Sequence, residues 1–167
     1  EIDKLGKPDR PVPSGQISMI NAKIAIYVLI SLSLIAIMSA GYFANISNQG
    51  LKSWMPSVVI WFVALFLLIN YESDSKYSFN LKNRGLPGNI AISASVAMVV
   101  LFGSAGVFEL TNGRVISVAI MGFLYNLARE IIKDVEDMDS DKGRNTLAMK
   151  IGPEKTRIIA YLICLMT

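Results

Sequence analysis

The chain has 167 residues, of which 53% are hydrophobic and 17% are charged, and its formal net charge is only +3. So small a net charge provides no basic surface for nucleic acid, and we expect no nucleic-acid partner. The chain contains no histidine, which excludes the commonest general base and the commonest zinc ligand, and its one cysteine, Cys164, is interpreted as a packing residue.

Long apolar runs alternate with charged segments along the chain. A helix needs about 20 residues to cross the hydrocarbon core of a bilayer. Four runs predict full membrane spans, at residues 24–44, 54–69, 90–108 and 115–128. The fourth is expected to continue as helix through Arg129 and Glu130. A truncated fifth span begins near Glu154, after the helix-start signal Gly152-Pro153.

These runs predict an all-α, multi-span transmembrane helical bundle. A soluble helical bundle is the alternative, but it needs polar faces at helical spacing, and residues 96–102 offer none. The chain starts at Glu1, which is no initiator, and it ends inside the fifth apolar run. We therefore interpret residues 1–167 as part of a larger membrane domain.

The charged residues between the spans lie mostly on one side of the predicted bundle. Consecutive spans alternate in direction, so the segments before residue 24, after residue 69 and after residue 128 share a side. The opposite side carries only the basic residues Lys52 and Arg114. By the positive-inside bias, the side rich in Lys and Arg is cytoplasmic. The sequence therefore predicts an integral, multi-pass membrane protein whose three long polar loops lie together on the cytoplasmic side.

The most informative segment follows the fourth span directly. Its acidic side chains recur at intervals of four, three and four residues: Glu130, Asp134, Asp137 and Asp141. In a helix this spacing places them on one face, where like charges repel. A divalent cation would reverse that penalty, and hard carboxylate oxygens suit Mg²⁺. The alternative is a solvated acidic loop. We favour the metal because the segment continues a span that carries Asn126 and Arg129.

The start of the chain offers a second acidic segment on the same side. Residues 1–3 read Glu-Ile-Asp, and cations that include Arg10 follow them. Two acidic clusters surrounded by cations are what a metal-bridged phosphate ligand requires. Taken alone, the acidic residues 1–3 are a weak signal.

The loop between the second and third spans carries further polar groups. Lys82 could contact phosphate oxygens, and Tyr77 and Ser78 could donate hydrogen bonds to them. The alternative is that Lys82 and Arg84 extend to lipid headgroups.

Taken together, these segments resemble the UbiA superfamily of intramembrane prenyltransferases. The resemblance covers essentially the whole chain and rests on motifs in the family's order. They are Glu1-Ile2-Asp3, the stretch from Pro8 to Gly15, Tyr77-Ser78, Leu81-Lys82, Gly88-Asn89, the triad Asp134, Asp137 and Asp141, and Gly143, Thr146 and Leu147. The chain departs from the family's pattern in one respect. The family's first motif has an Asn-Asp and another Asp upstream of the position of Glu1, and these residues are absent from the sequence given.

The resemblance implies a nine-helix bundle, of which this chain would form a partial domain, from the end of the first Asp-rich motif to the start of the seventh helix. It implies Mg²⁺ as cofactor, a prenyl diphosphate donor, a lipophilic acceptor and a surrounding lipid bilayer. The implied metal ligands are Asp3, Asp134, Asp137 and Asp141, the last three also forming the catalytic motif. Substrate-binding roles are expected for Lys82, Arg10, Tyr77, Ser78, Asn126, Arg129 and Lys133.

Within the superfamily, the segment from Arg129 to Asp137 looks most like the archaeal digeranylgeranylglyceryl phosphate synthases. These enzymes transfer a geranylgeranyl group to geranylgeranylglyceryl phosphate in ether-lipid synthesis. Branches with aromatic acceptors, which make quinones or chlorophyll, share the metal motifs and stay open as an alternative. The sequence does not indicate an oligomeric state.

Two non-enzymatic alternatives belong to other functional classes. A cation transporter or channel predicts ionisable residues along its spans, whereas residues 24–44 and 90–108 contain no Asp, Glu, Lys or Arg. A structural membrane subunit would leave the Asp-rich loops unexplained. Both alternatives are therefore less favoured than the prenyltransferase.

Overall fold

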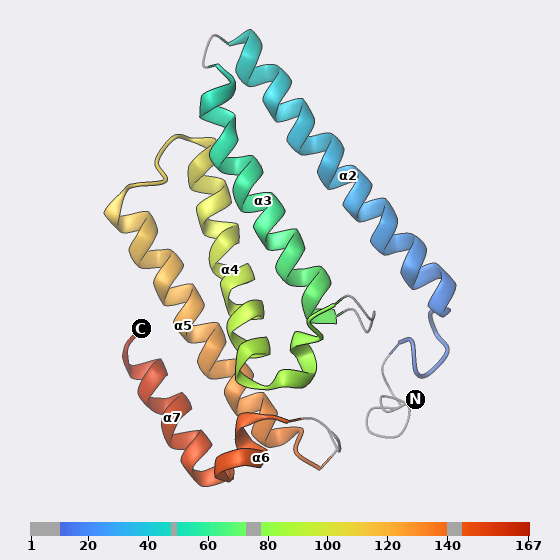
Figure 1. The fold of residues 1–167 in the computed structure, drawn as a ribbon, viewed down its shortest axis with the longest axis vertical. Coiled ribbons are helices and arrows are strands. Elements are labelled where there is room, and N and C mark those ends of the chain that lie inside the picture. The colour runs from blue at the N-terminus through green and yellow to red at the C-terminus, as the bar shows by residue number, and fades with distance from the viewer. Residues whose placement is uncertain (1–10, 48–49, 73–77, 140–144) are drawn as a thin grey trace. The chain divides into compact units, whose positions relative to one another are not determined.

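The computed structural model describes residues 11–47, 50–72, 78–139 and 145–167, and over these residues the chain is helical with short connections (Figure 1). The elements are α2 (Met19–Ile46), α3 (Leu51–Glu72), the 3-10 helix η1 (Leu81–Arg84), α4 (Leu86–Gly106), α5 (Gly113–Glu136), α6 (Leu147–Ile151) and α7 (Pro153–Leu165). The predicted all-α class is confirmed. The chain divides into two compact units, Glu1–Trp54 and Met55–Thr167.

Four helices are long and apolar enough to cross a membrane, namely Met19–Ile46, Leu51–Tyr71, Leu86–Gly106 and Gly113–Glu136. They coincide with the four predicted full spans, but their bounds differ. The first, second and fourth are longer than predicted at both ends, and α4 begins and ends earlier. The length of an apolar run underestimates the length of the helix, because polar residues at the ends of a span also form backbone hydrogen bonds within the helix.

The first unit consists mainly of α2. Ser18 caps its start by accepting a hydrogen bond from the backbone amide of Asn21 at 3.1 Å. The indole Nε1 of Trp54 donates to the carbonyl oxygen of Ile37 at 2.9 Å. A Cβ at Gly41 would lie 2.7 Å from Cε2 of the Trp54 ring, so the missing side chain lets this ring pack against α2.

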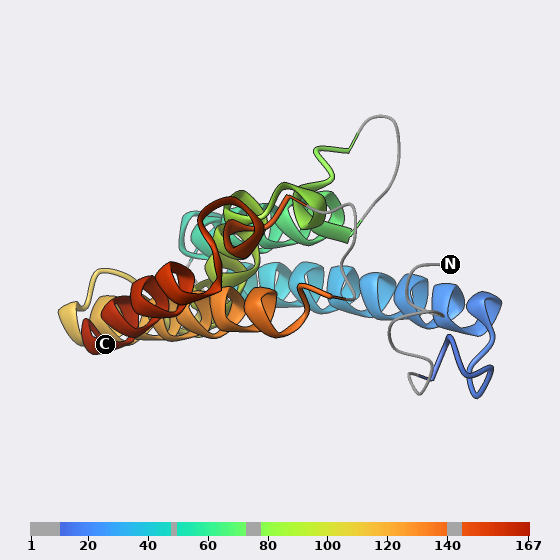
Figure 2. The ribbon, with the colours of Figure 1, turned by 90° about the horizontal axis from the view of Figure 1, so that it is seen from below.

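The second unit is organised around α5. α4 runs antiparallel to α5 and packs along it, and α7 packs on another side of α5 (Figures 1 and 2). Leu127, Ile131 and Ala160 form the core between α5 and α7, with Ile131 fully buried. The start of α4 and the end of α5 consequently lie at the same end of this unit.

The outer faces of the second unit are apolar. Val99 of α4, Ile120 of α5 and Leu162 of α7 are all exposed. An apolar surface of this extent suits lipid or additional helices and not water. Together with the four membrane-length helices, it is the surface of an integral membrane protein.

Candidate functional site

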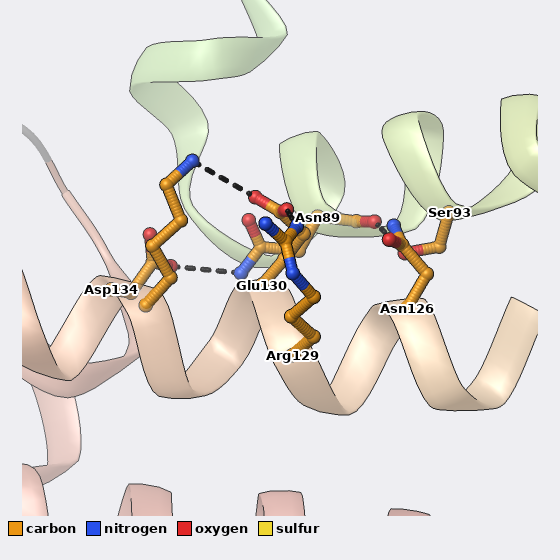
Figure 3. Close-up of polar contacts among 7 residues, drawn as sticks. Asn89, Ser93, Asn126, Arg129, Glu130 and Asp134 are labelled. Carbon is orange, nitrogen blue, oxygen red and sulfur yellow. Dashed lines mark hydrogen bonds and ion pairs between the residues drawn. The ribbon is translucent and has the colours of Figure 1, made fainter.

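Polar side chains gather where the first turns of α4 face the last turns of α5 (Figure 3). The side-chain amide Nδ2 of Asn89 donates to Oδ2 of Asp134 at 2.8 Å. Asn89 is buried, with 5% of its surface exposed, whereas Asp134 is half-buried. A hydrogen bond from the opposite helix therefore orients the first carboxylate of the predicted metal motif.

A second polar contact joins α4 and α5, one to two turns closer to the middle of both helices. The Nδ2 of Asn126 donates to the hydroxyl oxygen of Ser93 at 3.2 Å (Figure 3). The Ser93 hydroxyl is fully buried and donates to the backbone carbonyl of Asn89 at 2.6 Å. Asn126, for which a substrate-binding role was expected, is thus linked to the turn of α4 that orients Asp134.

Glu130 lies between these two contacts on α5 and is itself paired with two cations. Its Oε1 is 2.7 Å from Nη1 of Arg129, and its Oε2 is 3.5 Å from Nζ of Lys133. The Glu130 side chain is 9% exposed, against 61% for Arg129 and 43% for Lys133. The predicted acidic face of α5 therefore carries both acidic and basic groups, because Arg129 and Lys133 of the same helix neutralise the charge of Glu130.

Asp137 follows the last turn of α5 as its C-terminal cap, and its backbone amide donates to the carbonyl of Lys133 at 2.9 Å. The helix therefore ends between the predicted ligands Asp134 and Asp137. Glu130 and Asp134 lie one helical turn apart inside it.

The loop before α4 is held by Asn70 near the end of α3. The Ser78 hydroxyl donates to the Asn70 backbone carbonyl at 3.3 Å and accepts from the amide of Asn80 at 3.2 Å. The amide of Phe79 donates to the Asn70 side chain at 3.2 Å. Ser78, a predicted substrate ligand, therefore also shapes the turn that leads to η1, on which Lys82 lies half-buried.

Gly85 brings this loop against the segment that follows the Asp-rich motif. Its φ is +67°, and a Cβ there would collide with the backbone carbonyl oxygen of Asn145. Gly88 packs in a similar way against the carbonyl of Leu81. Two of the three polar loops predicted to share a side, those on either side of the α4–α5 pair, are thus in contact.

The carboxylates present suit Mg²⁺ as a partial ligand set. Among the described residues, no group of three or more acidic, cysteine or histidine side chains could hold a metal ion alone. Mg²⁺ usually takes one or two protein carboxylates and fills its shell with water and substrate phosphate. Asp134, held by Asn89, and Asp137 just beyond it match that requirement.

The remaining predicted site residues, Asp3, Arg10, Tyr77 and Asp141, lie outside the described residues. Three residues have a part in the observed geometry that the sequence did not predict: Asn89, known only as part of a motif, Gly85, and Glu130, which was expected on a metal-binding acidic face and pairs with two cations. Two of them leave a sequence signal. An amide in the first turn of an apolar span must find a partner, and Glu130 and Lys133 have the i,i+3 spacing of an ion pair.

Comparison with known proteins gives a consistent result. The profile of the UbiA prenyltransferase family matches residues 1–167. The chain is 37% identical over 171 residues to a digeranylgeranylglyceryl phosphate synthase of Korarchaeum cryptofilum, an alignment that covers 100% of the chain and 53% of that protein. Synthases of the same name from Ignicoccus hospitalis and Pyrococcus furiosus are 34% and 33% identical, over 92% and 100% of the chain and 47% and 53% of their own lengths.

The chain thus spans about half the length of these relatives. No solved structure matches it significantly. The family profile covers every residue of the chain, including the Asp134 and Asp137 segment. The chain belongs to the UbiA prenyltransferase family.

Proposed function

We propose that the complete protein is a magnesium-dependent membrane prenyltransferase that moves a geranylgeranyl group from its diphosphate to geranylgeranylglyceryl phosphate. One arrangement supports this most directly: the Asp134 and Asp137 end of α5 lies at the same end of the second unit as the turn that carries Lys82. The names of relatives 31% to 37% identical support the choice of acceptor.

The metal would be held by Asp134 and Asp137 together with Asp3 and Asp141. When bound, Mg²⁺ supplies positive charge where negative charge develops on the departing diphosphate. Asn89 keeps the Asp134 carboxylate in one orientation, so little reorganisation is needed when the donor arrives.

The protein's own cations and hydroxyls would hold the rest of the donor. Lys82 and Arg10 bind phosphate oxygens, and Tyr77 donates a hydrogen bond to them. Ser78 joins them when its single hydroxyl proton turns from the Asn70 carbonyl to the phosphate. The allylic carbon–oxygen bond breaks with its electron pair staying on the diphosphate. The acceptor hydroxyl oxygen bonds to that carbon, and its proton passes to the diphosphate. Apolar walls such as those of α4 and α5 exclude competing water.

The site is assigned to the cytoplasmic side of the membrane from the distribution of Lys and Arg. Thiol labelling of a Lys150→Cys variant in sealed, oriented vesicles tests this assignment, with Cys164 replaced by Ser. Labelling from the cytoplasmic face alone is expected. Labelling from the opposite face alone would reverse the orientation.

The direct test of the reaction uses the complete protein in detergent with a radiolabelled prenyl diphosphate. We expect lipid-soluble product with geranylgeranylglyceryl phosphate and Mg²⁺, and none after chelation with EDTA. Product formed only with an aromatic acceptor would move the protein to another branch of the family. If no acceptor gives product under any metal condition, the enzymatic proposal is wrong.

Lys82→Ala tests the donor assignment. Loss of a charged contact to phosphate should raise the KM for the donor by about tenfold, with a smaller change in the KM for the acceptor. Lys150→Ala, which removes an exposed lysine of α6, is the matched control. A donor KM that stays at the wild-type value would remove Lys82 from the site.

A further inference from the structure

The cluster of Glu130, Arg129 and Lys133 is larger than the burial of one acidic side chain requires. A buried carboxylate must be paired, because an uncompensated charge in a membrane protein is costly. One cation would neutralise Glu130, yet both Arg129 and Lys133 contact it, at 2.7 Å and 3.5 Å. These three side chains together carry a net charge of +1, and the carboxylates of Asp134 and Asp137, which the proposed function assigns to metal, follow them on the same helix end.

The two cations are arranged so that they can share one ligand. Arg129 and Lys133 are four residues apart, about 6 Å along the helix axis. Each contacts a different oxygen of the same buried carboxylate, while 61% of the Arg129 side chain and 43% of the Lys133 side chain stay exposed. Glu130 thus limits the freedom of two long side chains and leaves their outer surfaces accessible. This is the preorganisation that a tetrahedral phosphate with several acceptor oxygens can use.

We propose that Arg129 and Lys133, oriented by Glu130, form a second anion site that binds the phosphate monoester of the acceptor. The inference rests on the proposed function. In that function the donor diphosphate is held through metal at Asp134 and Asp137. Arg129 lies about 7 to 8 Å before Asp134 along the axis of α5. An acceptor whose hydroxyl attacks the donor carries its own phosphate only a few bonds from that hydroxyl, so neighbouring anion sites on one helix fit the pair of substrates.

The proposal also assigns a role in specificity. An aromatic acceptor has no phosphate monoester, and it would leave the two cations without their ligand. A site built to bind a charged group rejects the analogue that lacks the group, because its own polar groups are then left unpaired. Glu130 is a positioning residue in this scheme, since it acts through the two cations and not on the substrate.

Binding to the complete protein in uncharged detergent, with EDTA present, tests the proposal without turnover. The ligands are geranylgeranylglyceryl phosphate, its dephosphorylated alcohol and a bilayer phospholipid, each titrated by thermal stabilisation of the protein. We expect the wild type to bind the phosphate more tightly than the other two. Arg129→Gln and Lys133→Gln should each weaken phosphate binding by about tenfold to a hundredfold and leave alcohol binding unchanged. Arg157→Gln, at an exposed arginine of α7, is the control.

Any of four results in the binding experiment would overturn the proposal: no preference of the wild type for the phosphate, equal weakening for phosphate and alcohol, unchanged phosphate binding in both variants, or phospholipid binding as tight as that of the acceptor. The last would assign the two cations to lipid headgroups. In the radiolabel assay, a KM of Arg129→Gln or Lys133→Gln that rises for the donor and not for the acceptor would also overturn it, because the two cations would then bind the diphosphate. Absence of product in that assay would refute the proposed reaction. The binding measurements in EDTA do not depend on turnover, so they would still show whether Arg129 and Lys133 bind a phosphate monoester.

Discussion

α2 and α5 are both long enough to cross a bilayer, but they are stabilised differently. α2 carries a single charged residue, Lys23, and the hydroxyl of Ser33 donates to the Ile30 carbonyl of the same helix at 2.8 Å. The last turns of α5 instead carry a series of ionisable side chains, and Asp134 depends on Asn89 of a different helix.

The difference separates two requirements on a membrane helix. An apolar run with its backbone satisfied internally is sufficient to make a helix such as α2. A polar helix end is stable in the same setting only if other segments supply partners, because unpaired polar groups in an apolar medium cost several kcal/mol. Function in this chain is therefore expected where such partners meet, at the junction of α4 and α5.

The largest expected effect concerns the carboxylates at the end of α5. Asp134→Asn or Asp137→Asn in the complete protein should lower prenyl transfer at least about a hundredfold, because a metal-binding charge is lost. Membrane insertion should be unaffected, as measured by extraction and size-exclusion chromatography. Asp139→Asn, at an exposed residue of the same segment, is the control and should keep near wild-type turnover. Normal turnover in the Asp134 or Asp137 variant would remove that residue from the metal site.

The next effect sharpens the contrast between contacts across helices and contacts within one helix. Asn89→Leu should weaken binding of Mn²⁺, used as a spectroscopic substitute for Mg²⁺, by about tenfold to a hundredfold, because Asp134 loses its orienting partner. Electron paramagnetic resonance of the complete protein measures this binding without turnover.

Ser95→Ala is the matched control for Asn89→Leu. Ser95 is buried on α4, but its hydroxyl donates to the Ala91 carbonyl of its own helix at 3.0 Å. Its replacement should leave Mn²⁺ affinity unchanged. Equal affinities for the Asn89 variant and the wild type would mean that the contact with Asp134 has no influence on the metal.

A smaller effect is expected at the contact between the two polar loops. Gly85→Ala should destabilise the protein by about 1 to 3 kcal/mol, because φ is +67° and the new Cβ would meet the Asn145 carbonyl. Thermal unfolding in detergent measures the change. The control is Gly122→Ala in α5, where a Cβ meets nothing within 4 Å and alanine favours the helix. Equal unfolding temperatures for the two variants would refute the close approach.

The smallest effect belongs to α2. Trp54→Phe removes the hydrogen bond to the Ile37 carbonyl and should cost about 1 kcal/mol of stability, with turnover unchanged. Trp61→Phe provides the comparison for the loss of an indole ring from α3. A fall in turnover as large as that of Asp134→Asn would break the contrast between α2 and α5, because it would place chemistry near the first unit.

Much of the fold could be predicted because it depends on contiguous residues. Apolar runs located α2, α3, α4 and α5, and Gly152-Pro153 located the start of α7. The short elements η1 and α6 were not predicted, since neither is long enough to give a periodic apolar pattern. The extension of α5 to Glu136 was only partly predicted, because its last residues are polar and find their partners among themselves and on α4.

The sequence by itself determined the helical class and the membrane-length spans, and it predicted the residue types of the candidate site, because hydropathy and acidic spacing are read along one segment. Only the tertiary structure decided that Asn89 orients Asp134, that Glu130 holds two cations, and that Gly85 brings the loop carrying Lys82 against Asn145. The reason is physical: these are contacts of only a few ångströms between side chains and backbone groups, some of them far apart in the chain. Their partners are chosen by the packing of α4 against α5, and not by local propensity.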